Sequence, residues 1–268
     1  MINLKKYTQY YAGSLTHKNE NEIAKFLEEA NEKRKNKRVE KIHISIAPNK
    51  VSKELVKLLK QSNVITIELE VKIANNFILK KCNYGFDLDD IKKASKIIKR
   101  NRLNVGYQVM VGLPDSTKID EQESAKIIMR YRPTLVRIYP VLVVEGTDLE
   151  KEFNSDEYKP LTLEQGIERC KELIYIFNKK KIKAITVENF NETVLNKGEK
   201  GNLKIIAGPN HHAFPQLVED SIWYDSLVSR IKKYTNKAKE VKIEVPKKNV
   251  ETPRVQPEIK KEIKPVIV

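Results

Sequence analysis

Short runs of apolar and β-branched residues alternate along this chain with stretches in which apolar residues recur at helical spacing. The stretches with helical spacing cover residues 20–34, 51–61, 87–100 and 162–178. Because parallel neighbours need a long connection, this alternation predicts parallel strands joined by crossover helices. The runs that predict strands are residues 5–11, 41–47, 64–71, 104–111, 134–141 and 182–188.

The number of these strand–helix units predicts the type of α/β fold. Five or six units favour a partial parallel barrel of the (β/α)6 type over a closed eightfold barrel, and catalytic groups then lie where the strands end. The run VITIELEV is typical of a strand buried on both faces, as parallel sheets require. Asp87 predicts one helix start, and Thr162 with Gln165 predicts a capping box at another.

The pattern changes near residue 188, and we divide the chain there. Residues 1–188 are expected to form the partial barrel. Residues 189–248 hold a polar connection, a strand-and-turn segment and a long amphipathic stretch, which predict a small C-terminal α+β extension. Residues 249–268 are rich in proline and lysine and lack a periodic apolar face, so we expect a disordered tail.

The composition is strongly basic. Lys and Arg number 51 against 36 Asp and Glu, which gives a net charge of +15. Such a surplus favours contact with a polyanion, and RNA is the natural candidate. The alternative is that the charges lie on solvated helix faces, since their sign alternates along the predicted helices.

The two cysteines, Cys82 and Cys170, lie far apart in the sequence and predict neither a disulfide framework nor a metal site. The first residues lack the apolar segment of a signal peptide, and no apolar run is long enough to span a membrane. We therefore expect a cytoplasmic protein without a membrane partner.

Five segments in the same order resemble one family, the bacterial elongator catalytic-subunit-like radical SAM proteins. VMVGLPDST resembles the family's M-P-G-L-P-G-x-T, and VRIYPVLVVEGTDLE resembles R-I-Y-P-x-L-V-x-x-G-T-x-L. The resemblance covers nearly everything up to about residue 248. The five segments are residues 81–95, 109–117, 136–150, 158–173 and 206–225.

The resemblance implies binding sites for S-adenosylmethionine. YYAGSLT matches Y-G-G-S-F-T, a turn after a strand that holds the amino and carboxylate groups of this cofactor in such proteins. Gly13 and Ser14 fit the pattern, while Ala12 replaces its first glycine, which requires a negative φ there. The alternative for Gly13 and Ser14 is a plain turn without a ligand.

A second part of the predicted cofactor site lies on the strands. Arg137 and Tyr139 alternate with Ile138 and therefore share one strand face, where Glu68 is expected to pair with Arg137. These three residues complete the cofactor-binding set with Gly13 and Ser14. The alternative is a packed ion pair with no ligand.

The resemblance also implies a [4Fe–4S] cluster held by a C-x3-C-x2-C loop. That loop is expected just before Met1 and does not occur in this chain, and neither Cys82 nor Cys170 matches it. Several other family positions that would face the cofactor are also changed. They are Ala47, Glu70, Lys72, Ile73, Tyr84 and Phe86.

These observations predict a radical SAM protein related to elongator-like tRNA-modifying enzymes that lacks the cluster and is inactive alone, as a remnant or a truncated product. Whether the chain is an enzyme stays open, and no catalytic residue is assigned. Two alternatives are a basic RNA-binding module and a pseudoenzyme subunit. The subunit would pair with a partner protein through the sheet edge that the missing first strand leaves open.

Overall fold

The computed structural model describes residues 9–36, 41–186 and 204–235. The chain divides into two compact units, Met1–Glu219 and Asp220–Val268. The described part of the second unit is the end of one helix, α8 (Phe214–Thr235), from Asp220 onward. The predicted domain boundaries at residues 188 and 248 both lie outside the described residues, so they stay predictions.

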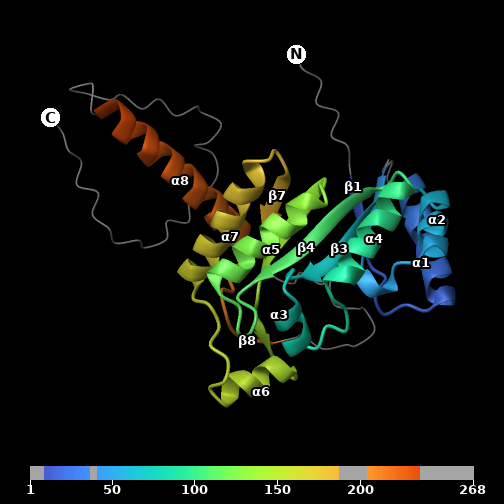
Figure 1. Cartoon of the computed structure of the whole chain (residues 1–268), viewed down its shortest axis with the longest axis horizontal. Helices are drawn as coiled ribbons and strands as arrows, with labels where there is room; N and C mark the ends of the chain where they lie inside the picture. Colours follow the sequence, from blue (N-terminus) through green and yellow to red (C-terminus); the bar gives the residue numbers. More distant parts are fainter. Residues whose placement is uncertain (1–8, 37–40, 187–203, 236–268) are drawn as a thin grey trace. The chain divides into compact units, whose positions relative to one another are not determined.

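The first unit is built on a six-stranded sheet in which all neighbouring strands are parallel (Figure 1). The predicted α/β class is confirmed, and no closed barrel forms among the described residues, where β1 and β7 are the edge strands. The strands, in spatial order, are β1 (Gln9–Ser14), β2 (Lys41–Ile46), β3 (Val64–Lys72), β4 (Asn104–Val111), β5 (Leu135–Pro140) and β7 (Lys183–Thr186).

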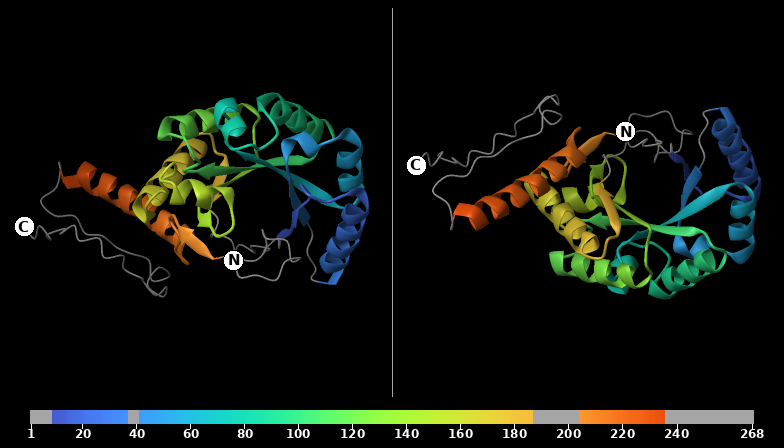
Figure 2. Two further views of the ribbon diagram at one scale, coloured as in Figure 1. Left: turned by 90° about the horizontal axis from the view of Figure 1, so that it is seen from below. Right: turned by 90° about the horizontal axis from the view of Figure 1, so that it is seen from above.

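Helices follow the outer face of this curved sheet (Figure 2). The four predicted helices are confirmed, including the start of one at Asp87 and the capping box of another at Thr162. A fifth helix was missed, although Thr117 and Asp120 form a capping box that is visible in the sequence. These helices are α1 (Glu20–Asn36), α2 (Lys53–Gln61), α4 (Leu88–Arg100), α5 (Lys118–Arg130) and α7 (Leu163–Asn178).

Short elements gather where the strands end, at the lower edge of the sheet in Figure 1. They were not resolved from the sequence, apart from the strand in the segment after residue 203. One close contact ties this region to α7: a Cβ on Gly166 would lie 2.7 Å from Pro209, so only glycine fits. The elements are η1 (Pro48–Lys50), α3 (Asn76–Lys81), α6 (Asp148–Asn154) and the antiparallel pair β6 (Val143–Val144) with β8 (Ile205–Ala207).

The core lies between the sheet and the helices. Ile42, Ile44 and Ile46 of β2 are at most 1% exposed and occupy the side of the strand that faces the helices. Truncating any of them to alanine is expected to cost about 2–5 kcal/mol. Because side chains alternate across a strand, the residues between them lie on the opposite face, which we call the inner face.

Candidate functional site

The inner face of the sheet is polar along four consecutive strands. His43 and Ser45 lie on β2, Thr66, Glu68 and Glu70 on β3, Gln108 on β4, and Arg137 and Tyr139 on β5. His43, Glu68 and Gln108 are 4%, 0% and 7% exposed. Both faces of these strands are therefore buried, as predicted from VITIELEV, but only one is apolar. Burying polar side chains costs free energy unless they are hydrogen-bonded. A cluster of them on one face therefore indicates a binding site.

Glu68 is the centre of this face. Its Oε2 accepts hydrogen bonds from Arg137 Nε at 2.8 Å and from Gln108 Nε2 at 3.0 Å. The predicted pairing of Glu68 with Arg137 is confirmed. Burial raises the pKa of the Glu68 carboxyl, but His43, Arg137 and Gln108 together outweigh it and hold that pKa below its ordinary value.

A glycine makes room for this carboxylate. Gly106 of β4 lies beside Glu68, and a Cβ at Gly106 would lie 2.9 Å from Glu68 Cγ. The sequence prediction missed Gly106. Its signal was a glycine in a strand interior, which often marks the close approach of another group.

Three buried polar atoms of the inner face have no hydrogen-bond partner among the described residues. They are Nδ1 and Nε2 of His43 and Oε1 of Glu68. His43 Nδ1 is 3.8 Å from Glu68 Oε1, which is too long for a hydrogen bond. Such orphaned atoms are rare in folded proteins, and a ligand that fills them is the simplest account.

A second carboxylate lies nearer the strand ends. Glu70 Oε1 accepts hydrogen bonds from Ser14 Oγ and from Ser45 Oγ, both at 2.6 Å, and Lys72 Nζ is 3.7 Å from Glu70 Oε2. Burial raises the pKa of Glu70, but Lys72 and the two hydroxyls outweigh it and lower that pKa. Glu70 is one of the positions that differ from the family pattern, and its carboxylate accepts the hydrogen bond of the Ser14 hydroxyl.

The stretch around Gly13 differs from the prediction. We expected a strand to end at residue 11 and a turn at residues 12–14, but β1 continues through Ser14 with a bulge between Tyr11 and Gly13. Gly13 has a φ of +125°, which side chains rarely adopt, whereas Ala12 does not have a positive φ. The bulge re-aims the end of β1, so that Ser14 reaches Glu70.

Tyr139 lies on the inner face two residues beyond Arg137, opposite Met110 of β4. It is half-buried. The structure therefore brings Glu68 and Arg137 into contact and Ser14 onto the neighbouring Glu70, with Gly13 in the bulge and Tyr139 farther along β5.

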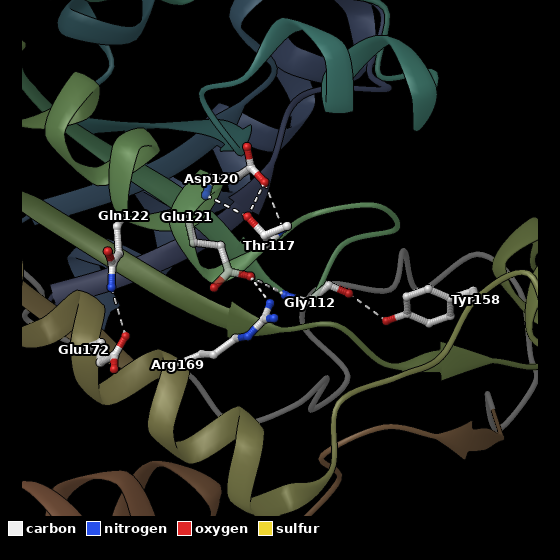
Figure 3. A network of polar contacts seen from close by, with 8 residues as sticks. All are labelled: Gly112, Thr117, Asp120, Glu121, Gln122, Tyr158, Arg169 and Glu172. Carbon is white, nitrogen blue, oxygen red and sulfur yellow. Dashed lines mark hydrogen bonds and ion pairs between the residues drawn. The ribbon is translucent and has the colours of Figure 1, made fainter.

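A separate polar network holds the loop that follows β4 (Figure 3). Glu121 Oε1 accepts hydrogen bonds from the Gly112 backbone N–H and from Arg169 Nη1, both at 2.8 Å. Tyr158 Oη donates to the Gly112 carbonyl at 2.7 Å. Burial raises the pKa of Glu121 despite Gly112 and Arg169. Nothing in the sequence pattern predicted this network, which fixes Gly112 in its positive-φ conformation.

Two family models match consecutive parts of the chain. The model described as the radical SAM superfamily matches residues 10–128, and that of the radical SAM C-terminal domain matches residues 133–224. The first range contains β1 to β4, with Ser14, Glu68 and Glu70, and the second contains Arg137 and Tyr139.

The chain belongs to the elongator-like radical SAM family. A tRNA uridine(34) acetyltransferase of Methanocaldococcus infernus is 35% identical over 128 residues, which are 47% of this chain and 24% of that protein. The enzyme of the same description from Methanocaldococcus jannaschii is 36% identical over 119 residues, 43% of this chain and 22% of that protein. This radical SAM chain thus spans less than a quarter of either relative.

A solved structure agrees with this assignment. The archaeal Elp3 of Methanocaldococcus infernus, with an N-terminal deletion, superposes with a TM-score of 0.59 and 26% identity. The match covers 70% of this chain and 43% of that chain. The sheet of this radical SAM chain and its helices therefore follow the fold of an elongator protein.

The radical SAM family implies two cofactors, S-adenosylmethionine and a [4Fe–4S] cluster. The inner face fits the first, because it offers carboxylates for cationic groups, a guanidinium for a carboxylate and buried atoms that lack a partner. The cysteines do not fit the second. Cys170 is buried in α7, and Cys82 ends α3, and burial raises the pKa of both thiols.

Two further observations complete the description of the radical SAM chain. Among residues 9–36, 41–186 and 204–235, no group of three His, Cys, Asp or Glu side chains is arranged to hold a metal ion. Within the same ranges, no helix has the length and apolar character needed to cross a bilayer.

Proposed function

We propose that this chain binds S-adenosylmethionine on its inner face as part of a tRNA-directed radical SAM protein, and that its own residues do not assemble the [4Fe–4S] cluster. The observation that carries the proposal is the buried Glu68–Arg137 pair with the unfilled atoms of His43 and Glu68 beside it. Radical SAM relatives named as tRNA uridine(34) acetyltransferases support tRNA as the substrate.

Each part of the inner face has a distinct role in this proposal. Glu68 and Glu70 are anionic and suit the ammonium and sulfonium groups of the ligand, whereas Arg137 suits its carboxylate. Gly13 forms the bulge of β1 that brings Ser14 to Glu70, and Tyr139 offers an aromatic ring and a hydroxyl nearer the strand ends. Together with a reduced cluster, the ligand supplies radical chemistry, and the residues of this chain bind and orient it.

In this proposal the cluster thiolates come from outside the 268 residues, because the sequence has only two cysteines: Cys82, directly after α3, and Cys170, buried within α7. A polypeptide that carries the missing cysteines would pair beside β1, the strand at one edge of the described sheet.

Equilibrium dialysis with labelled S-adenosylmethionine tests the binding site. We expect saturable binding by the wild-type chain and at least a tenfold weaker affinity for Glu68→Gln. Ser14→Ala leaves the ion pair intact and provides a second variant if Glu68→Gln unfolds. Lys151→Gln, on the exposed face of α6, is the matched control and should bind as the wild type does. Absence of saturable binding by the wild-type chain would refute the proposal.

Iron and sulfide analysis after anaerobic reconstitution tests the cluster separately. We expect substoichiometric iron in the 268-residue chain and the same residual iron in the variant Cys82→Ser/Cys170→Ala. A full [4Fe–4S] cluster that is lost in this double variant would show that the two cysteines ligate it and would overturn this part of the proposal.

A second candidate function is RNA binding without radical chemistry. The observation in its favour is the hydrogen bond from the Ser14 hydroxyl to the Glu70 carboxylate. This hydrogen bond uses the hydroxyl that a cofactor would otherwise contact. Salt-sensitive binding of tRNA, together with no binding of S-adenosylmethionine, would decide for this alternative.

A further inference from the structure

Basic side chains line the edge of the sheet where the strands begin. In a parallel sheet, each helix that leads directly into the next strand ends at this edge, opposite the strand ends that carry Ser14 and Glu70. In Figure 1 the turn from α7 to β7 lies at the upper edge, away from α3 and α6. We call the following exposed residues the basic rim: Lys60, Lys99, Arg100, Arg102, Arg130, Arg132, Lys179, Lys180, Lys181 and Lys183.

The basic rim contains no acidic residue. Residues 59–63, 98–104, 129–134 and 177–183 include neither Asp nor Glu, although charges of both signs alternate within α1 and α5. Among the described residues, no carboxylate forms an ion pair with a side chain of the rim. The described residues therefore do not neutralise the positive charge of these four helix ends.

The turns after α2, α4 and α5 are in direct contact, so the charge is continuous across these three helix ends. Lys60 Nζ at the end of α2 donates to the carbonyl of Asn101, which follows α4, at 2.9 Å. Lys99 Nζ at the end of α4 donates in the same way to the carbonyl of Tyr131, which follows α5. With adjacent helices about 8–10 Å apart, four helix ends extend over about 30 Å.

Some rim residues adopt a backbone conformation that glycine usually occupies. Arg102, Arg132 and Lys181 have φ values of 62°, 48° and 57° in the turns after α4, α5 and α7. The corresponding residue after α2 is Asn63, with a φ of 63°, and asparagine tolerates this region. Three strained positions at one edge thus carry long cationic side chains.

Helix stabilisation alone does not explain this arrangement. Cations in a last helical turn interact favourably with the helix dipole, which accounts for Lys60, Arg100 and Arg130. It does not account for cations beyond the helix in a strained conformation, or for their crowding. Burial and then the nearby charge of Arg132 lower the pKa of Lys99. A partner with high negative charge density would compensate both costs.

We infer that the basic rim binds the phosphate backbone of RNA, at the edge of the sheet opposite the strand ends that carry Ser14 and Glu70. The inference rests on the proposed function, which supplies an RNA partner, and adds where that partner docks. Glu70 lies six residues after the start of β3, about 20 Å along the strand from the rim. The rim would therefore position an RNA and not contact the bound cofactor.

The side chains of the rim also indicate how RNA is contacted. Long cationic groups predominate, and Tyr131, the one partly exposed ring in these four turns, is stacked on the buried Tyr107. Such side chains suit phosphates rather than bases, so binding should be independent of sequence. A membrane surface is disfavoured, because Leu58 is the one large apolar side chain that is exposed in the described last turns of these helices.

Fluorescence anisotropy with labelled unfractionated tRNA, measured between 50 and 200 mM salt, tests the inference. The variant Arg102→Gly/Arg132→Gly/Lys181→Gly removes three charges and relieves three strained positions, so it should melt no lower than the wild type. We expect its affinity to fall at least tenfold, with a salt slope smaller by about 2–3.

Two control variants separate charge from backbone effects. Asn63→Gly makes the same backbone change without loss of charge and should bind as the wild type does. The variant Lys53→Gln/Lys92→Gln/Lys93→Gln loses three charges nearer the other ends of α2 and α4 and should weaken binding by less than threefold.

The possible failures are distinguishable. If the wild-type chain binds no tRNA at low salt, both the rim and the proposed RNA partner are wrong. If it binds and the glycine variant keeps its affinity and salt slope, the rim is wrong while the proposed function stands. The inference would also be overturned if the glycine variant lost binding to vesicles of anionic phospholipid while it kept its binding to tRNA.

Discussion

The buried pair of Glu68 and Arg137 gives a quantitative prediction for Glu68→Gln. Glutamine keeps the shape and the acceptor oxygen, but it leaves the Arg137 guanidinium beside a neutral amide. Removing one partner of a buried pair costs about 3–5 kcal/mol. The Arg137 side chain is 20% exposed while that of Glu68 is 0% exposed, so the lower end of this range, about 3 kcal/mol, is expected.

Urea denaturation at pH 7 measures this loss. With a slope of about 3 kcal/mol per molar, the upper end for small proteins, the midpoint should fall by about 1 M. Below about pH 4 the difference from wild type should shrink, because a carboxyl with a lowered folded-state pKa loses its stabilising effect as the pH falls through that value.

A double-mutant cycle isolates the pair itself. The variant Glu68→Gln/Arg137→Gln should be more stable than the sum of the single losses predicts, by about 2 kcal/mol. The reasoning is refuted if Glu68→Gln costs less than about 1 kcal/mol or if the two losses simply add. In that case the pair would be solvated and would not organise the inner face.

Three further predictions concern single sites. The variant Arg169→Met should lose about 3 kcal/mol of unfolding free energy at pH 8, because it leaves the buried Glu121 carboxylate without its partner. This loss should shrink as the pH falls toward 5, because burial raises the pKa of Glu121 and the folded state takes up a proton. Urea titrations at several pH values measure this. Glu70→Gln should be less stable than wild type above about pH 5, and the difference should shrink as the pH falls below about 4, since the folded-state pKa of Glu70 is lowered; a constant difference would contradict this. With a thiol reagent at pH 8, Cys82 should react slowly in the native chain and Cys170 only after unfolding, because burial raises the pKa of both; rapid labelling of two thiols would contradict this.

The strands were predictable because their signal is local. In β2 the isoleucines 42, 44 and 46 alternate with His43 and Ser45, and the same alternation recurs in β3. Capping residues such as Asp87 and Thr162 likewise act within one turn, so the starts of α4 and α7 were correct. The short helices α3 and α6 were missed, because six or seven residues carry too little periodic signal.

The candidate site was predictable only in part. The alternation of side chains along β5 placed Arg137 and Tyr139 on one face. A buried Arg137 needs an opposite charge, which predicted its pairing with Glu68, and the structure confirms this pair. The sequence analysis predicted a turn at Gly13 and not a bulge, because a glycine after a strand fits either conformation. Residues such as Gly106 gave only a weak signal, since their role depends on the neighbouring strand.

The sequence by itself determined the α/β class, the order of the six sheet strands and four of the helices along the chain, and the family, because these depend on period, caps and motifs that lie within single segments. Only the tertiary structure decided that Ser14, Ser45 and Glu70 meet at one point, and that helix ends far apart in the sequence form one basic rim. The physical reason is register: which side chains become neighbours is set by how parallel strands align and how helices pack across them.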